Sequence, residues 1–267
     1  MFVIENLSLY YSQIKSALED AALFFPLVAA VANETQTGRV FVNNRLEPTQ
    51  FYVEHSFGFA QIFGEPDALF EQELEVYFFG QPSLGVPKVR LYGTYVPNFI
   101  SRDHSKVLVS ERQRFTLDLP EFMRYLGGVS ITKYSTQIEK VTVANVDEVE
   151  LSFGLTRRFW PSEIAFVDDA NGFVLREEGR LVSICYSAAS AFGFDEIDVL
   201  TLPEFKRRGF GKSVVITFLQ AALARGATPL WDCYTNNLPS MSLAEEIGFR
   251  PSGDAYPFFT INRQSMH

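Results

Sequence analysis

The sequence predicts an α/β fold with a mixed sheet, on three observations. Over residues 170–260, short strand patterns alternate with helical patterns in the order β-β-β-α-β-α-β. The 267 residues, 47% of them hydrophobic, suffice for one large domain or two of ordinary size. The first half also mixes strand and helix patterns. We therefore expect two regions, an α/β region over 1–130 and a second domain over 131–267.

The N-terminal region opens with helical spacing of apolar residues. This spacing predicts one or two helices over 7–33, with Pro26 marking a kink or a break. Strand-like patterns follow at 39–43, 49–64 (two strands or a hairpin), 88–96 and 112–119. Helices are expected from Pro66 onward and over 119–128, the second ended by Gly127 and Gly128. Residues 128–160 carry the weakest pattern, and no element is assigned to them.

In the C-terminal region, turn residues and helix ends separate the predicted elements more clearly. Three strands are predicted at 172–177, 181–189 and 195–202, the first two joined by a turn at Glu178-Gly179. An amphipathic helix follows over 212–226 and ends at Gly226. A strand at 228–235, a helix at 237–248 and a last strand complete the order.

Composition and charge narrow the function classes. The net charge of −9 disfavours general binding of nucleic acid or of an anionic membrane, and suits a cationic substrate mildly. Cys185 and Cys233 lie in apolar runs, which predicts buried, reduced thiols. With no CxxC pair and three histidines, no metal site is expected. The N-terminus has no basic n-region and no uninterrupted apolar run, so a cytoplasmic location is expected.

The stretch LPEFKRRGFGKS, residues 202–213, has the character of a phosphate-binding loop. A nucleotide P-loop would need glycine where Lys206 stands, and a dinucleotide fingerprint would need glycine where Val214 stands. What remains is a glycine-containing, basic loop between a strand and a helix. Such a helix N-terminus attracts anions through its N–H groups and its dipole. An ordinary basic turn would have the same composition.

The spacing of this loop resembles a known family. The acyl-CoA loop of the GNAT N-acetyltransferase superfamily reads V-x-P-x-x-[RQ]-x-x-G-x-[GA], and here Thr201 to Gly211 follow it, with Lys206 replacing the arginine or glutamine. A second family feature follows in order: Asn237 after a strand, and then the Gly248-Phe249 pair, whose Phe is twelve residues on. The resemblance is strong over 170–260 and weak over 1–165. A faint echo of GFVLREEGRLVSICYSAASAFG in the first half supports the hypothesis of a degenerate second GNAT-like unit there.

The resemblance implies positions for acetyl-CoA. Its pyrophosphate would lie on the loop, and its pantetheine arm would pair with the preceding strand, because the next strand of the family splays away. The implied cofactor-binding residues are Leu200, Thr201, Leu202, Arg207, Arg208, Gly209, Phe210, Gly211, Lys212, Asn237 and Ser240. Asn237 would either bind the pantetheine arm or cap the last helix.

The catalytic positions depart from the family. Seven residues after Asn237, where many members carry a tyrosine acid, stands Ala244; Tyr234 or Cys233 on the preceding strand could serve instead. For the general base we favour Glu196 over Asp195 and Asp198. Strict alternation places Glu196 and Asp198 on one face of the strand, although a bulge in this strand would break that parity.

These features predict an acetyl-CoA-dependent N-acetyltransferase that acts on a primary amine of a small molecule or peptide. The acetyl group would pass by direct attack of the amine on the thioester. Two alternatives stay open: a non-catalytic acyl-CoA-binding or sensing module, and an O-acyl or longer-chain acyltransferase. The expected partners are acetyl-CoA and the amine acceptor, without nucleic acid or membrane, and a homodimer is left open.

Overall fold

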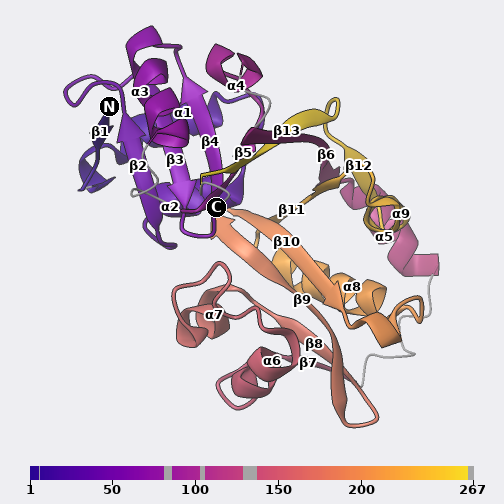
Figure 1. The fold of residues 1–267 in the computed structure, drawn as a ribbon. Helices are drawn as coiled ribbons and strands as arrows, with labels where there is room; N and C mark the ends of the chain where they lie inside the picture. The colour runs from indigo at the N-terminus through magenta and orange to yellow at the C-terminus, as the bar shows by residue number, and fades with distance from the viewer. Residues whose placement is uncertain (6, 81–85, 103–105, 129–136, 264–267) are drawn as a thin grey trace. The chain divides into compact units, whose positions relative to one another are not determined.

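The computed structural model describes residues 1–5, 7–80, 86–102, 106–128 and 137–263 (Figure 1). The chain divides into two compact units. Unit 1 consists of Met1–Arg112 and Ala255–His267, and unit 2 of Gln113–Asp254. The predicted boundary between 130 and 131 falls in 129–136, outside the described residues, and stays a prediction.

Unit 1 is a mixed sheet with helices. Its strand order is β1 (Phe2–Val3), β2 (Gly38–Val42), β3 (Gln50–His55), β4 (Phe59–Gly64), β5 (Lys88–Tyr92), β13 (Tyr256–Asn262) and β6 (Val107–Leu117). Neighbours are antiparallel except β4 and β5, which are parallel. The described part of the unit also contains a 3-10 helix (Leu7–Leu9) and the α-helices α1 (Tyr11–Glu19), α2 (Pro26–Ala32), α3 (Ala68–Phe79) and α4 (Asn98–Arg102).

Local signals explain the first elements of unit 1. Pro26 is the first residue of α2, where its missing N–H costs nothing, so the predicted break between two helices is confirmed. The β3–β4 hairpin turns at Gly58, whose φ of 91° lies in the left-handed region. An added Cβ there would lie 2.1 Å from the Lys88 carbonyl oxygen, so only glycine fits.

Unit 2 contains the C-terminal elements that the sequence predicts. Its strand order is β7 (Ile138–Lys140), β8 (Phe173–Glu177), β9 (Arg180–Ala191), β10 (Phe194–Thr201), β11 (Thr228–Tyr234) and β6, with β12 (Phe249–Pro251) also paired to β6. Its helices are α5 (Leu119–Gly128), α6 (Val146–Phe153), α7 (Glu163–Asp169), a 3-10 turn (Pro203–Phe205), α8 (Phe210–Ala224) and α9 (Leu238–Glu246). Strands β10 and β11 pair in parallel, whereas the pairs β7–β8, β8–β9, β9–β10 and β6–β12 are antiparallel.

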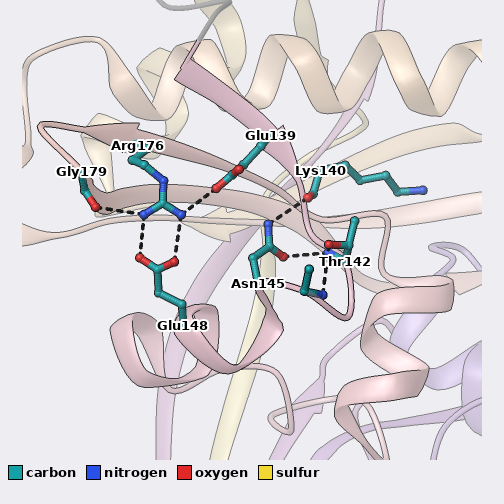
Figure 2. A network of polar contacts seen from close by, with 8 residues as sticks. Glu139, Lys140, Thr142, Asn145, Glu148, Arg176 and Gly179 are labelled. Carbon is teal, nitrogen blue, oxygen red and sulfur yellow. Dashed lines mark hydrogen bonds and ion pairs between the residues drawn. The ribbon is translucent and has the colours of Figure 1, made fainter.

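The weakly patterned segment 128–160 contains β7 and α6, and α7 follows it at Glu163–Asp169; the sequence predicted none of these three elements. Figure 2 shows how Arg176 of β8 connects two of them. Its guanidinium binds Glu148 of α6 at 2.7 and 2.8 Å and Glu139 of β7 at 2.8 Å, and donates to the Gly179 carbonyl at 2.9 Å. These contacts join residues that are far apart in the sequence, so a local sequence pattern cannot predict them.

The core of unit 2 lies under helix α8. Val214, Val215, Phe218 and Leu219 form the buried face that the amphipathic pattern predicted. Cys185 and Cys233 lie in the same core as free cysteines, which confirms the prediction of buried, reduced thiols. Burial raises the pKa of the Cys185 thiol well above its usual value, so this side chain stays protonated.

The two units share one stretch of topology. In unit 1 an antiparallel pair, β3–β4, is followed by α3 and by β5, which runs parallel to β4. In unit 2 the pair β9–β10 is followed by α8 and by β11, which runs parallel to β10. Each parallel pair is in register over a short stretch, ending at Gln61 opposite Tyr92 and at Glu196 opposite Leu230.

Candidate functional site

The predicted loop follows a strand that loses one neighbour partway along. Parallel pairing of β10 with β11 ends at Glu196 opposite Leu230. Pairing of β10 with β9 continues to Thr201 opposite Ser183. Over 197–201 the β11-facing edge of β10 is therefore outside the parallel ladder, as the resemblance led us to expect.

The direction of the backbone groups along β10 decides which residues face this edge. The Leu202 N–H donates to the Val182 carbonyl of β9 at 2.9 Å. Backbone groups alternate in direction along an antiparallel pair, so Leu200 also faces β9 while Val199 and Thr201 face the opposite edge. Thr201 was among the predicted residues; Val199 was missed, because its orientation depends on the register with β9.

The loop itself turns through two left-handed residues. Arg207 has a φ of 61° and Gly209 a φ of 86°, and α8 begins directly afterwards. The Ser213 N–H bonds the Gly209 carbonyl at 3.1 Å, which closes the first turn of the helix. The N–H groups of Gly211 and Lys212 precede that bond and point out of the helix start. The backbone thus has the form of an anion-binding helix N-terminus.

The basic side chains of the loop are only partly available. Arg208 binds Glu177 at 2.5 Å and lies over the Phe210 ring at 4.7 Å. Lys212 binds Glu246 at 2.7 Å. Arg207 is exposed to solvent. Positive charge therefore surrounds the loop, but Arg208 and Lys212 each already form an ion pair with an acidic residue.

The acidic residues of β10 divide between the two faces of the strand. The irregularity in this part of the sheet lies on the neighbouring strand: between Glu196 and Ile197 the register shifts so that Ala188 of β9 is the extra residue. The extra residue does not lie on β10, so the alternation along β10 is kept. Asp195 pairs with Arg225, the residue after α8, whereas Glu196 and Asp198 lie on the opposite face.

Glu196 belongs to a buried charged cluster where β10 and β11 part. Arg114 of β6 donates to both Glu196 carboxylate oxygens, at 2.8 and 2.9 Å. Its Nε lies 3.9 Å from a carboxylate oxygen of Asp232 on β11, whose side chain is only 1% exposed. Two carboxylates thus share one guanidinium away from water. Arg114 and Asp232 were not among the predicted residues; the one signal in the sequence was an acidic residue inside the apolar run PLWDCYT.

Asp198 has a different environment. It accepts a hydrogen bond from the Tyr186 hydroxyl at 2.6 Å and lies 3.5 Å from Arg158. Burial, together with the nearby Asp198 charge, raises the pKa of Tyr186 well above its usual value. Tyr186 therefore stays protonated and remains a donor. The Asp198 side chain is 32% exposed and the Glu196 side chain 7%, so Asp198 is the more accessible acid.

The remaining predicted residues lie around α9. Asn237 caps this helix, its side-chain oxygen accepting from the Ser240 N–H at 3.3 Å, which is one of the two roles expected for it. The Ser240 hydroxyl accepts from the Trp231 indole at 3.1 Å. Ala244 is fully buried in the core, and Tyr234 is the half-buried last residue of β11.

No helix in the described ranges is long and apolar enough to cross a membrane. Nor do three or more metal-binding side chains gather at any place that the structure describes.

Comparison with known proteins relates most of the chain to one family. A family model described as GNAT acetyltransferase matches residues 25–259. An uncharacterized N-acetyltransferase of Bacillus subtilis, YdfB, is 22% identical over 248 residues, covering 90% of this chain and 92% of the relative.

Solved structures show the same fold. A GCN5-related N-acetyltransferase-like protein from Streptococcus suis has a TM-score of 0.70 at 18% identity, covering 96% of this chain and all of its own. An acetyltransferase of the GNAT family from Colwellia psychrerythraea has a TM-score of 0.59 at 14% identity, with 97% and 98% coverage.

Proposed function

This chain belongs to the GNAT acetyltransferase family, and from that premise we propose that it transfers an acetyl group from acetyl-CoA to a primary amine of a small molecule or peptide. Membership makes the protein an acyltransferase, of a family that uses acetyl-CoA. The observation that carries the proposal is the free edge of β10 beyond Glu196, which leads directly into a basic loop at a helix N-terminus. A cytoplasmic location and a homodimer stay predictions.

In this proposal the CoA pyrophosphate lies at the start of α8. The N–H groups of Gly211 and Lys212 would donate to its oxygens, and Arg207 would add an exposed cation. Apart from Gly209 and its two chain neighbours, no atom of the described residues lies within 4 Å of the position that a Cβ on Gly209 would take, so the space above this residue is open. Val199 and Thr201 would pair with the pantetheine amides as an added strand would. Leu200, Leu202 and Arg208 would line the same path, whereas the Phe210 side chain is buried in the core at 1% exposure, so Phe210 would contribute through its backbone alone.

The acceptor amine must lose a proton before it attacks the thioester carbon. Glu196 remains our candidate base, because it lies where the two strands part and Arg114 fixes its position. The cluster of Glu196, Asp232 and Arg114 carries a formal excess of one negative charge, which would attract an acceptor ammonium. When the C–S bond breaks, Tyr234 would protonate the leaving thiolate.

Calorimetric titration with acetyl-CoA tests whether the protein binds this cofactor. We expect binding at micromolar concentrations, weakened several-fold by Arg207→Ala because one cation near the phosphates is lost. Arg157→Ala is the matched control, since Arg157 is an exposed arginine paired with Glu163 in another part of unit 2. Absence of binding at millimolar acetyl-CoA would refute the proposal.

Release of free CoA in the presence of an amine panel tests the chemistry. With an accepted amine, Glu196→Gln should lower kcat/KM by about 10²–10⁴-fold, the usual contribution of a general base. Asp198→Asn is the matched comparison on the same face of β10. A large loss with Asp198→Asn and none with Glu196→Gln would assign the base to Asp198 instead.

One observation favours a second candidate function, a module that holds acyl-CoA without chemistry. Ala244 stands where many family members carry a tyrosine acid, and it is fully buried. Tyr234→Phe separates the two functions: a lowered kcat supports catalysis through Tyr234. Acetyl-CoA binding without turnover of any amine would support the module.

We also infer that unit 1 is a degenerate second unit of the same fold. The shared order of an antiparallel pair, a helix and a parallel strand supports this inference. The loop before α3 has lost the basic character of the loop before α8: Glu65, Pro66 and Asp67 stand there. We therefore expect no CoA-binding site in unit 1.

A further inference from the structure

Unit 1 contains a cavity that the proposed acetyl transfer does not use. Its volume is about 760 Å³, which is enough for a small organic molecule. It is lined by helix α1 and residues 20–22, by the end of β4 and residues 65–66, by residues around the start of β3, and by Thr94 and Tyr95, which follow β5. All of these segments belong to unit 1.

The deep wall of this cavity is apolar. Phe51, Ile62 and Phe63 line it and are 2%, 0% and 3% exposed. A ligand with a hydrocarbon body would lose water-exposed apolar surface on entering, which favours binding roughly in proportion to the area buried.

The rim is acidic. Asp20 and Glu65 line the cavity, both exposed, and none of the described residues that line it is a lysine or an arginine. Ser16, Thr49 and Thr94 add hydroxyl groups. A positively charged group would thus meet two carboxylates and hydrogen-bond acceptors, whereas a carboxylate or phosphate would be repelled.

The nearby helix N-terminus does not reverse this preference. The Asp67 carboxylate caps α3, accepting from the N–H groups of Leu69 at 2.9 Å and Phe70 at 3.0 Å. It also accepts from the Asn43 amide at 3.0 Å, and these bonds lower its pKa. The first donors of α3 are therefore already occupied by an ionised side chain, in contrast to the glycine loop before α8.

We propose that this cavity binds a protonated amine that carries an apolar body. The inference goes beyond the proposed function, because it concerns unit 1 alone and does not require acetyl transfer. Charge selects the head group at the Asp20 and Glu65 rim, and the wall of Phe51, Ile62 and Phe63 receives the hydrocarbon part.

The probe for the test is octylammonium, titrated into the full chain by calorimetry at pH 7, with octanoate as the probe of equal length and opposite charge. We expect octylammonium to bind in the millimolar range or better and octanoate at least tenfold more weakly. Equal affinity for the two probes, or no octylammonium binding at several millimolar, would overturn the proposal.

Variants locate the binding. The double variant Asp20→Asn/Glu65→Gln should weaken octylammonium about tenfold and narrow the gap to octanoate. Ser16→Trp should fill the cavity from the exposed side of α1 and weaken binding at least tenfold. Glu5→Gln, an exposed acid outside the cavity, is the control and should leave the affinity unchanged.

Circular dichroism of each variant checks that unit 1 stays folded. Octylammonium binding that survives both Ser16→Trp and the double variant would place the amine elsewhere and refute the site. Because acetyl-CoA binding is measured separately, failure here leaves the proposed function standing.

Discussion

At the scale of single residues, the loop before α8 depends on backbone conformations that few side chains accept. Gly209 has a φ of 86°, and Arg207 reaches 61° despite its side chain. The left-handed region costs a residue with a Cβ about 1–2 kcal/mol, and glycine avoids that cost. The loop thus accommodates one strained residue, Arg207, beside one that is not strained.

Gly209→Ala should therefore lower the free energy of unfolding by about 1 kcal/mol. The space around this position is open, with no atom within 4 Å of an added Cβ, so the loss comes from backbone strain alone. Urea denaturation measures it. Gly127→Ala is the control: its site in α5 is equally open, and alanine is about 0.5–1 kcal/mol better than glycine inside a helix. Equal effects of the two substitutions would contradict the account.

At the scale of elements, Arg176 of β8 forms ion pairs with α6 and with β7 (Figure 2). The hydrogen bond from Arg176 lowers the pKa of Glu148 below its ordinary value of 4.5. A carboxylate whose folded-state pKa is lowered stabilises the fold above its unfolded pKa. It loses that contribution as the pH falls through the folded pKa.

Glu148→Gln should thus flatten the fall in stability on acidification below pH 4.5, while lowering stability at pH 7. We expect less than about 1 kcal/mol at pH 7, because the Glu148 side chain is 45% exposed and solvent screens the pair. Urea unfolding across a pH series measures both effects. Leu151→Ala, at an 88% exposed position of the same helix, should keep the wild-type profile. If the unfolding free energy of Glu148→Gln changed with pH in parallel with that of the wild type, Glu148 would not contribute to the pH dependence of stability.

At the scale of the whole molecule, the C-terminal segment that begins at Ala255 belongs to unit 1, together with the N-terminal part of the chain. Strand β13 pairs with β5 and with the first half of β6, so residues from both ends of the sequence share one core. Strand β6 begins in unit 1 and ends in unit 2, where β12 pairs with Phe115 to Leu117.

Ile261→Ala should therefore weaken unit 1, although it lies near the C-terminus. Ile261 is fully buried opposite Val89, and such a truncation costs about 2–5 kcal/mol. Hydrogen exchange read by mass spectrometry should show lost protection in β4 and β5, with β8 and β9 unchanged. Val215→Ala, buried in unit 2, is the mirror control and should produce the opposite pattern. Loss of protection in both units from either substitution would show that they unfold together.

Local sequence patterns were sufficient to predict the α/β class, the order of the C-terminal elements and the loop at the start of α8. These features depend on local physics: the spacing of apolar residues, glycine and proline positions, and N–H groups at a helix start. Tertiary structure decided what depends on register and on distant partners. Arg114 reaches Glu196 across 82 positions of the chain, the backbone direction of Val199 follows from its pairing with β9, and β13 completes a sheet that starts at residue 2. Local patterns do not specify such pairings, because side chains meet across a sheet only once the strands are in register.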